Sequence, residues 1–136
     1  MARYIGILDG EAGAYGVSIP DAPGCVAMGE TMDKAVQNAV AALAEWSSDV
    51  IAQGDMLNAP RSIDDLRGDA EVADLLKEGG SFVVLPLVLN SGKPTRANIS
   101  MDTGLLEAID ETADRLGLTR SAFLATAARD KIGASY

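Results

Sequence analysis

Residues 15–31, YGVSIPDAPGCVAMGET, carry the pattern that decides the fold of the N-terminal part of the chain. Residues 15–19 alternate between apolar and small side chains, as a half-buried strand does. Residues 20–24 contain two prolines, which fix φ, and a glycine that tolerates positive φ, so they predict a rigid turn. Residues 25–29 can return as another strand. With the apolar residues 4–9 ahead of them, these segments predict a three-stranded antiparallel meander.

A long helix is predicted after these strands. Thr31 can cap its N-terminus, and Asp33 lies in the first turn, where a negative charge is favourable. Apolar residues then recur at helical spacing, namely Ala35, Val36, Ala39, Val40, Leu43, Trp46 and Val50. Gly54 can end the helix. We therefore expect one helix over residues 31–53 that covers the sheet.

A connector and a further strand follow this helix. Residues 62–66 and 71–77 have the composition of short helical segments. Residues 82–89 are almost wholly apolar, which predicts a strand buried on both faces. Because Pro86 cannot donate a ladder hydrogen bond, this strand is expected at a sheet edge or beside a bulge.

The charge of the 136-residue chain is unevenly divided. A polar, turn-rich segment predicts a linker at 91–93 between domains at 1–90 and 94–136. Residues 1–92 hold five Lys and Arg against fourteen Asp and Glu, a net charge of −9, whereas residues 93–136 hold six of each. Such an acidic domain repels nucleic acid and attracts basic proteins, while a neutral domain can still contact phosphate through basic residues on one face.

The C-terminal domain has the pattern strand, helix, helix. Residues 95–101 alternate, with apolar side chains on one face and a polar second face made of Arg96, Asn98 and Ser100. The next two residues can cap a helix that ends at Gly117, and Thr119 can cap a second helix over about 120–132. A unit of about forty residues buries too little core by itself, so we expect a homodimer or a higher homo-oligomer.

Two such strands, paired antiparallel, would form a ribbon that fits the major groove of operator double-stranded DNA. Arginine suits guanine, asparagine suits adenine and serine suits either, so the expected DNA-binding residues are Arg96, Asn98 and Ser100. Backbone N–H groups at the start of the second helix can bind a DNA phosphate, together with the side chains of Thr119, Arg120 and Ser121. The alternative interpretations are a solvated strand face and plain helix capping.

The remaining composition excludes several classes of function. With one cysteine and no histidine, the chain cannot form an intrachain disulfide, a structural zinc site or a histidine-dependent catalytic centre. Cys25 is expected to be a small buried apolar residue. A metal-dependent nuclease using Asp9, Glu11 and Asp49 is the competing enzyme hypothesis, which their spacing does not support. We therefore expect no enzyme, catalytic residue, metal or cofactor.

Targeting signals give a further expectation. The N-terminus has no apolar secretory segment, and no apolar run approaches the ~20 residues that a membrane helix needs. A cytoplasmic protein with no membrane partner is expected.

Two stretches of the chain now resemble one family. Residues 15–25, continuing through Gly29-Glu30-Thr31 and the alanine-rich helix that ends near Trp46, closely resemble the N-terminal domain of HicB antitoxins. Residues 94–132 resemble ribbon-helix-helix repressors. One departure is Lys34, where the family often has an acidic residue. Both motifs in one chain, in this order, strengthen the joint interpretation.

The resemblance implies an α+β fold and a function. The N-terminal antiparallel sheet with its long helix would be similar to a pared-down ribonuclease H fold without nuclease activity, followed by a ribbon-helix-helix (β-α-α) dimerisation domain. It implies an antitoxin that inhibits a HicA-type toxin, a small basic protein that cleaves mRNA, and that represses its own operon by binding operator DNA. The alternative is a free-standing ribbon-helix-helix repressor whose N-terminal domain senses something else.

Overall fold

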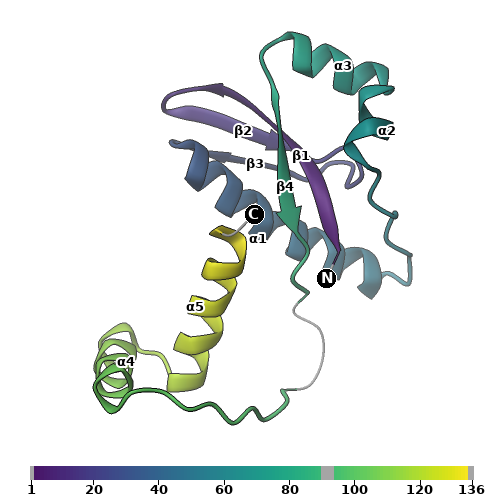
Figure 1. Cartoon of the computed structure of the whole chain (residues 1–136). Coiled ribbons are helices and arrows are strands. Elements are labelled where there is room, and N and C mark those ends of the chain that lie inside the picture. Colours follow the sequence, from purple (N-terminus) through teal and green to yellow (C-terminus); the bar gives the residue numbers. More distant parts are fainter. Residues whose placement is uncertain (1, 90–93, 135–136) are drawn as a thin grey trace. The chain divides into compact units, whose positions relative to one another are not determined.

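The computed structural model describes residues 2–89 and 94–134 and has an α+β fold (Figure 1). The chain consists of two compact units, Met1–Ser91 with Ile132–Tyr136, and Gly92–Lys131. The predicted linker at 91–93 lies outside the described residues.

The first unit contains a four-stranded antiparallel sheet. Its order is β3-β2-β1-β4, with strands at Arg3–Glu11 (β1), Ala14–Ser18 (β2), Val26–Gly29 (β3) and Ser81–Pro86 (β4). The predicted meander of β1, β2 and β3 is confirmed. β1 runs two residues further than expected, so the turn falls at residues 12 and 13. β4 is an edge strand that pairs with β1, and Pro86 lies opposite Arg3. The edge position agrees with the prediction made from Pro86, which has no N–H to donate.

Helix α1, at Met32–Ala52, packs on one face of the sheet (Figure 1). The Thr31 hydroxyl oxygen accepts a hydrogen bond from the Lys34 backbone N–H at 3.1 Å, which confirms the predicted cap. At Gly29, an added Cβ would lie 2.4 Å from the backbone nitrogen of Ala35, so β3 meets α1 closely only because this residue has no side chain. The core on this face contains Tyr4, Val17, Ile19, Ala22, Cys25, Ala35, Ala39, Leu43, Leu85 and Leu87.

Two short helices cover part of the other face of the sheet. They are α2 at Ile63–Arg67 and α3 at Ala70–Lys77, close to the predicted segments. A capping box between Ser62 and Asp65 starts α2, and the Asp69 carboxylate caps α3. Their apolar side chains pack against β1 and β4, in a cluster of Ile5, Ile7, Leu66 and Val72 with Ile63, Leu75, Leu76, Phe82 and Val84. β4 is therefore packed on both faces, as its composition predicted.

The second unit contains helix α4 at Thr103–Leu116 and most of helix α5, which spans Arg120–Ala134. Gly117 ends α4 in the left-handed conformation with φ of 71°, as predicted. The strand predicted over residues 95–101 is wrong for the single chain, because the described residues 94–102 contain no strand. A strand exists only where its backbone groups bond to a neighbouring strand, and the predicted neighbour belongs to another copy.

Candidate functional site

The segment that carries the predicted base contacts is extended and exposed. All residues from 94 to 100 are exposed, including Arg96. A groove of about 500 Å³ lies between this segment and the ends of α4 and α5. It brings together four of the six predicted site residues, which are Asn98, Ser100, Arg120 and Ser121. Arg96 and Thr119 are not among the residues that line it.

The guanidinium of Arg120 makes a two-point ion pair with Asp110 on α4. Arg120 Nε donates to Asp110 Oδ1 at 2.9 Å, and Arg120 Nη2 donates to Asp110 Oδ2 at 2.7 Å. This hydrogen bonding lowers the pKa of Asp110 and raises the pKa of Arg120. Two of the five N–H donors of Arg120 are thus used to hold the start of α5 against α4. The sequence reasoning missed Asp110, because a ten-residue spacing across a helix corner has no recognisable periodicity.

Thr119 caps α5. Its hydroxyl oxygen accepts from the backbone N–H of Ala122 at 3.1 Å. This hydrogen bond supports the capping interpretation. The phosphate-binding role of residues 119–121 stays a prediction.

Several apolar side chains of the second unit face solvent. Ile99, Leu105 and Leu116 are each more than half exposed, and Leu118 is also exposed. Ile109 and Ala113 are the buried apolar residues of α4. The sequence places Leu105 and Leu116 on the apolar face of α4 together with these two, so the single chain covers only part of that face.

In the first unit, the loop that holds the Pro-Asp-Ala-Pro-Gly motif is tied to the connector after α1. Asp21 is 8% exposed, and its carboxylate accepts from the Arg61 backbone N–H at 2.7 Å and from Arg61 Nε at 2.8 Å. Arg61 Nη1 also pairs with Asp69 at 3.2 Å. Gly24 has φ of +83°, as the turn required. These contacts support the rigid turn that was predicted over residues 20–24.

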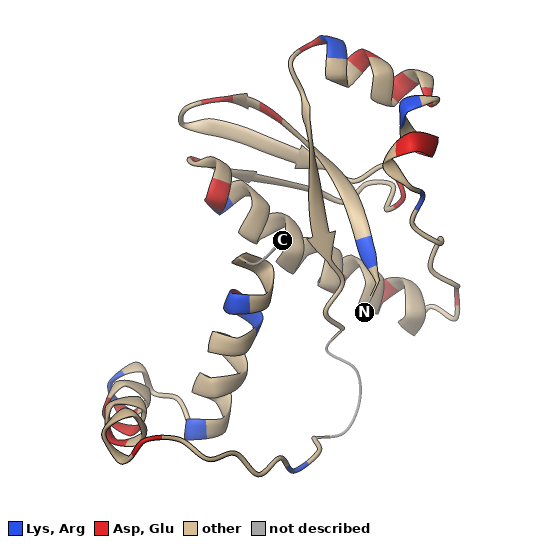
Figure 2. Cartoon of the chain, viewed as in Figure 1, with Lys and Arg blue, Asp and Glu red and all other residues tan. Residues whose placement is uncertain are grey.

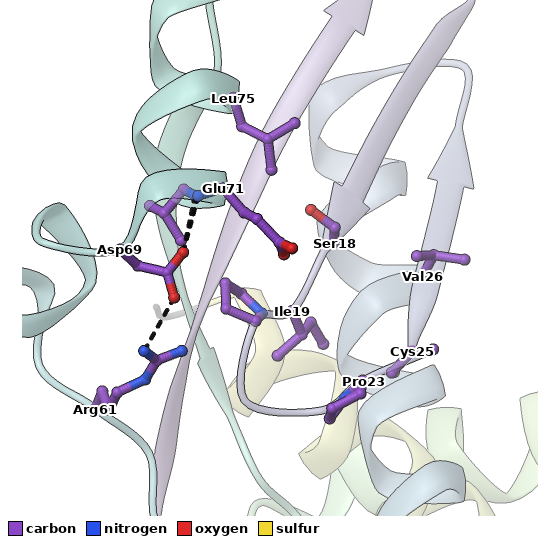
Figure 3. Close-up of a pocket in the computed structure, with 12 residues that line it drawn as sticks. Ser18, Ile19, Pro23, Cys25, Val26, Arg61, Asp69, Glu71 and Leu75 are labelled. Atoms are coloured by element: carbon purple, nitrogen blue, oxygen red, sulfur yellow. Dashed lines mark hydrogen bonds and ion pairs between the residues drawn. The ribbon is translucent and has the colours of Figure 1, made fainter.

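A second cleft, of about 370 Å³, lies between α3 and strands β2 and β3 of the sheet (Figure 3). Ser18 and Val26 line it from β2 and β3, and Glu71, Val72 and Leu75 line it from α3. Figure 3 shows the Glu71 side chain reaching across the cleft toward Ser18. Sequence reasoning did not single out this cleft, because its two walls come from segments more than forty residues apart.

The chemistry of the other candidate residues is limited. Cys25 is buried and free, as expected, and burial raises the pKa of its thiol, which disfavours the reactive thiolate. In the described part of the chain, no three His, Cys, Asp or Glu residues lie close enough to hold a metal ion. No helix within residues 2–89 and 94–134 is long and apolar enough to cross a membrane.

Comparison with known proteins identifies the family. A family model described as the HicB-like antitoxin of bacterial toxin–antitoxin systems matches residues 4–128. The chain belongs to the HicB-like antitoxin family. This family match spans the sheet, α1, the connector and most of the second unit.

Two solved structures resemble this HicB-like chain, one over nearly its whole length and one over about two thirds of it. The crystal structure of the Burkholderia pseudomallei antitoxin HicB is 29% identical, with a TM-score of 0.57, and the match covers 95% of this chain and 97% of that one. A chain in a HicA3–HicB3 toxin–antitoxin complex is 22% identical with a TM-score of 0.52, covering 63% of this chain and 98% of that one, which is a likeness of fold.

A curated relative comes from a bacteriophage. A 14.9 kDa protein from the rep–hol intergenic region of Haemophilus phage HP1 is 29% identical over 97 residues, which is 71% of each chain.

Proposed function

We propose that this HicB-like antitoxin neutralises a small basic HicA-type toxin through residues 1–90 and represses its own operon through residues 94–136. The acidic unit would cover the active surface of the toxin, so inhibition is steric and requires no enzyme activity, metal or cofactor. Membership of the family and the net charge of −9 over residues 1–92 support the toxin partner.

The exposed apolar face of the second unit carries the DNA-binding half of the proposal. Ile99 on the extended segment and Leu105 and Leu116 on α4 would become buried if a second copy paired its own segment 95–101 with this one. The same pairing would supply the missing strand hydrogen bonds and leave the polar residues Arg96, Asn98 and Ser100 on the outer face. A two-stranded ribbon with that face fits the major groove.

Co-expression with the neighbouring reading frame tests the toxin half. That frame is expected to encode a basic protein of well under one hundred residues, which arrests growth alone and co-purifies with this chain. A neighbour that is neither toxic nor bound by this chain, with DNA binding intact, would favour the second candidate, a free-standing repressor with a sensing domain.

Sedimentation equilibrium tests the assembly. We expect at least a dimer for the full chain, and a substitution of Ile99→Glu should shift it toward monomer and abolish operator binding together. A monomeric parent chain that still binds its operator with full affinity would contradict the ribbon.

A further inference from the structure

Within the described part of the first unit, α2 and α3 cover only the β1–β4 side of one face of the sheet. In the strand register Ser18 pairs with Val26 and Gly16 pairs with Met28, so these side chains share one face. Helices α2 and α3 cover the β1–β4 side of this face but stop short of β3. Val26 is 66% and Met28 is 65% exposed, which is unusual for apolar residues at successive positions on one face of a strand. We call this surface, made of Asp9, Gly16, Ser18, Val26 and Met28, the open half-face.

The open half-face continues into the cleft beside α3. Val72 and Leu75 form the apolar wall of that cleft, and Val26 belongs to both surfaces. An apolar side chain entering the cleft would therefore contact both β3 and α3. Ser18 and Glu71 add polar groups to the lining of the cleft (Figure 3).

Acidic side chains border this apolar surface. Asp9 pairs with Gly16 in the register, and its Oδ1 lies 3.2 Å from the position that a Cβ on Gly16 would take, so the carboxylate lies over the glycine. Glu11 follows on the same face of β1, and Glu71 lies at the cleft. Figure 2 shows acidic residues near the hairpin end of β1 and along α3. Arg61 also lines the cleft, but its ion pairs are made with Asp21 and Asp69, so its charge is directed to those two carboxylates.

We propose that the open half-face and its cleft are the docking surface for the basic partner of this antitoxin. The partner would place an apolar side chain in the cleft against Val26 and Leu75 and direct Lys or Arg side chains toward Asp9 and Glu71. An apolar centre with a charged rim of opposite sign to the partner is the usual arrangement of a specific protein interface. This inference rests on the proposed toxin-binding function and gives that function a location.

The charge argues against a second copy of the same chain on this surface. Residues 1–92 carry a net charge of −9, so two such domains repel each other, whereas a basic protein is attracted. Addition of a foreign strand at the β3 edge is also disfavoured. Asn38 Nδ2 on α1 already donates to the Met28 carbonyl at 2.7 Å, which occupies a backbone acceptor of this edge strand.

A matched pair of methionine substitutions tests the proposal in the full chain. Met28→Lys places a positive charge on the exposed β3 side of the open half-face, and Met56→Lys makes the same change at a methionine that is 90% exposed in the connector. The probe is the purified small basic protein from the neighbouring reading frame, with binding measured by biolayer interferometry. We expect Met28→Lys to weaken binding at least ~30-fold, because a positive charge within the docking surface repels a basic partner, and Met56→Lys to change it less than ~2-fold. Glu71→Lys should weaken binding and flatten its dependence on salt.

Each outcome decides between the inference and the underlying function. If the parent chain fails to bind the probe, the toxin-binding function itself is wrong, and the docking surface with it. If the parent binds and Met28→Lys binds equally well, the function stands and the docking surface is refuted. If Met28→Lys changes self-association while toxin binding is unchanged, a second copy occupies the face, which also refutes the proposal. Equal urea midpoints for parent and both variants verify that folding is intact.

Discussion

Replacing Asp21 with alanine should destabilise the N-terminal unit by a predictable amount. The carboxylate is 8% exposed and accepts two hydrogen bonds from Arg61, one from the backbone N–H at 2.7 Å and one from Nε at 2.8 Å. The Nε bond reaches a side chain that is 40% exposed, so we count it as contributing little. The bond from the backbone N–H to a charged acceptor contributes about 1.5–3 kcal/mol. We therefore expect Asp21→Ala to lower the free energy of unfolding by about 2 kcal/mol.

Thermal and urea unfolding can measure this loss directly. For a domain of about ninety residues, about 2 kcal/mol lowers Tm by roughly 8–16 °C. Asp21→Asn keeps an acceptor oxygen for the Arg61 N–H and should lose only about 1 kcal/mol. Asp55→Ala is the matched control, because Asp55 is an exposed aspartate in the same connector and its removal should change stability by less than about 0.5 kcal/mol.

Two results would refute this reasoning. Equal stability of Asp21→Ala and the parent would mean that the connector is not anchored to the loop through this carboxylate. A loss that disappears in 1 M NaCl would mean that the exposed ion pair, and not the sheltered backbone bond, supplies the stability, since salt screens exposed pairs far more strongly.

Three further predictions concern other parts of the chain. Arg96→Ala should weaken operator binding by about 1–3 kcal/mol in a gel-shift titration and leave toxin neutralisation unchanged. Arg67→Ala is the control. Equal operator affinity of Arg96→Ala and the parent would show that Arg96 does not contact the bases. The backbone N–H of Val72 and then Arg61 hold the pKa of Asp69 below its ordinary value of 3.8, so the folded state binds fewer protons than the unfolded state, and urea midpoints should fall as the pH drops below about 4. Asp69→Asn should make that fall smaller, and an identical acid profile would contradict the assignment. Gly29→Ala should lower the free energy of unfolding by about 1–3 kcal/mol, because its Cβ would meet the Ala35 backbone. Gly104→Ala is the control and should not lower it, because the space around Gly104 is open. Equal stability of the two variants in urea unfolding would show that α1 can move away from β3.

Local patterns predicted the elements of the first unit well. Period-two alternation over residues 15–19 and the capped helical pattern from Thr31 depend only on neighbours along the chain, so β2, β3 and α1 appear where expected. Long-range contacts could not be predicted in this way. Arg61 meets Asp21 across forty residues, and no periodicity connects the two. The open half-face was missed for the same reason, because it depends on where α3 stops.

The predicted strand over residues 95–101 failed for a different reason. Its alternation is clear in the sequence, yet the single chain offers it no neighbouring strand, and the segment stays extended and exposed. An alternating pattern predicts which faces a strand will have once it is paired, but it does not state which chain supplies the partner. The exposed Ile99 supports the proposal that a second copy supplies the neighbouring strand.

Under the two proposals, charge favours different partners for the two exposed apolar surfaces. The second unit carries Ile99 and Leu105 on a region whose basic and acidic residues balance, so two copies can approach without repulsion. The first unit carries Val26 and Met28 within a region of net charge −9, where self-association is opposed and a basic protein is favoured. The proposed function requires both kinds of contact, with a second copy to bind a palindromic operator and with a toxin to neutralise it. Because the negative charge is confined to one unit, the two proposed associations would use different surfaces.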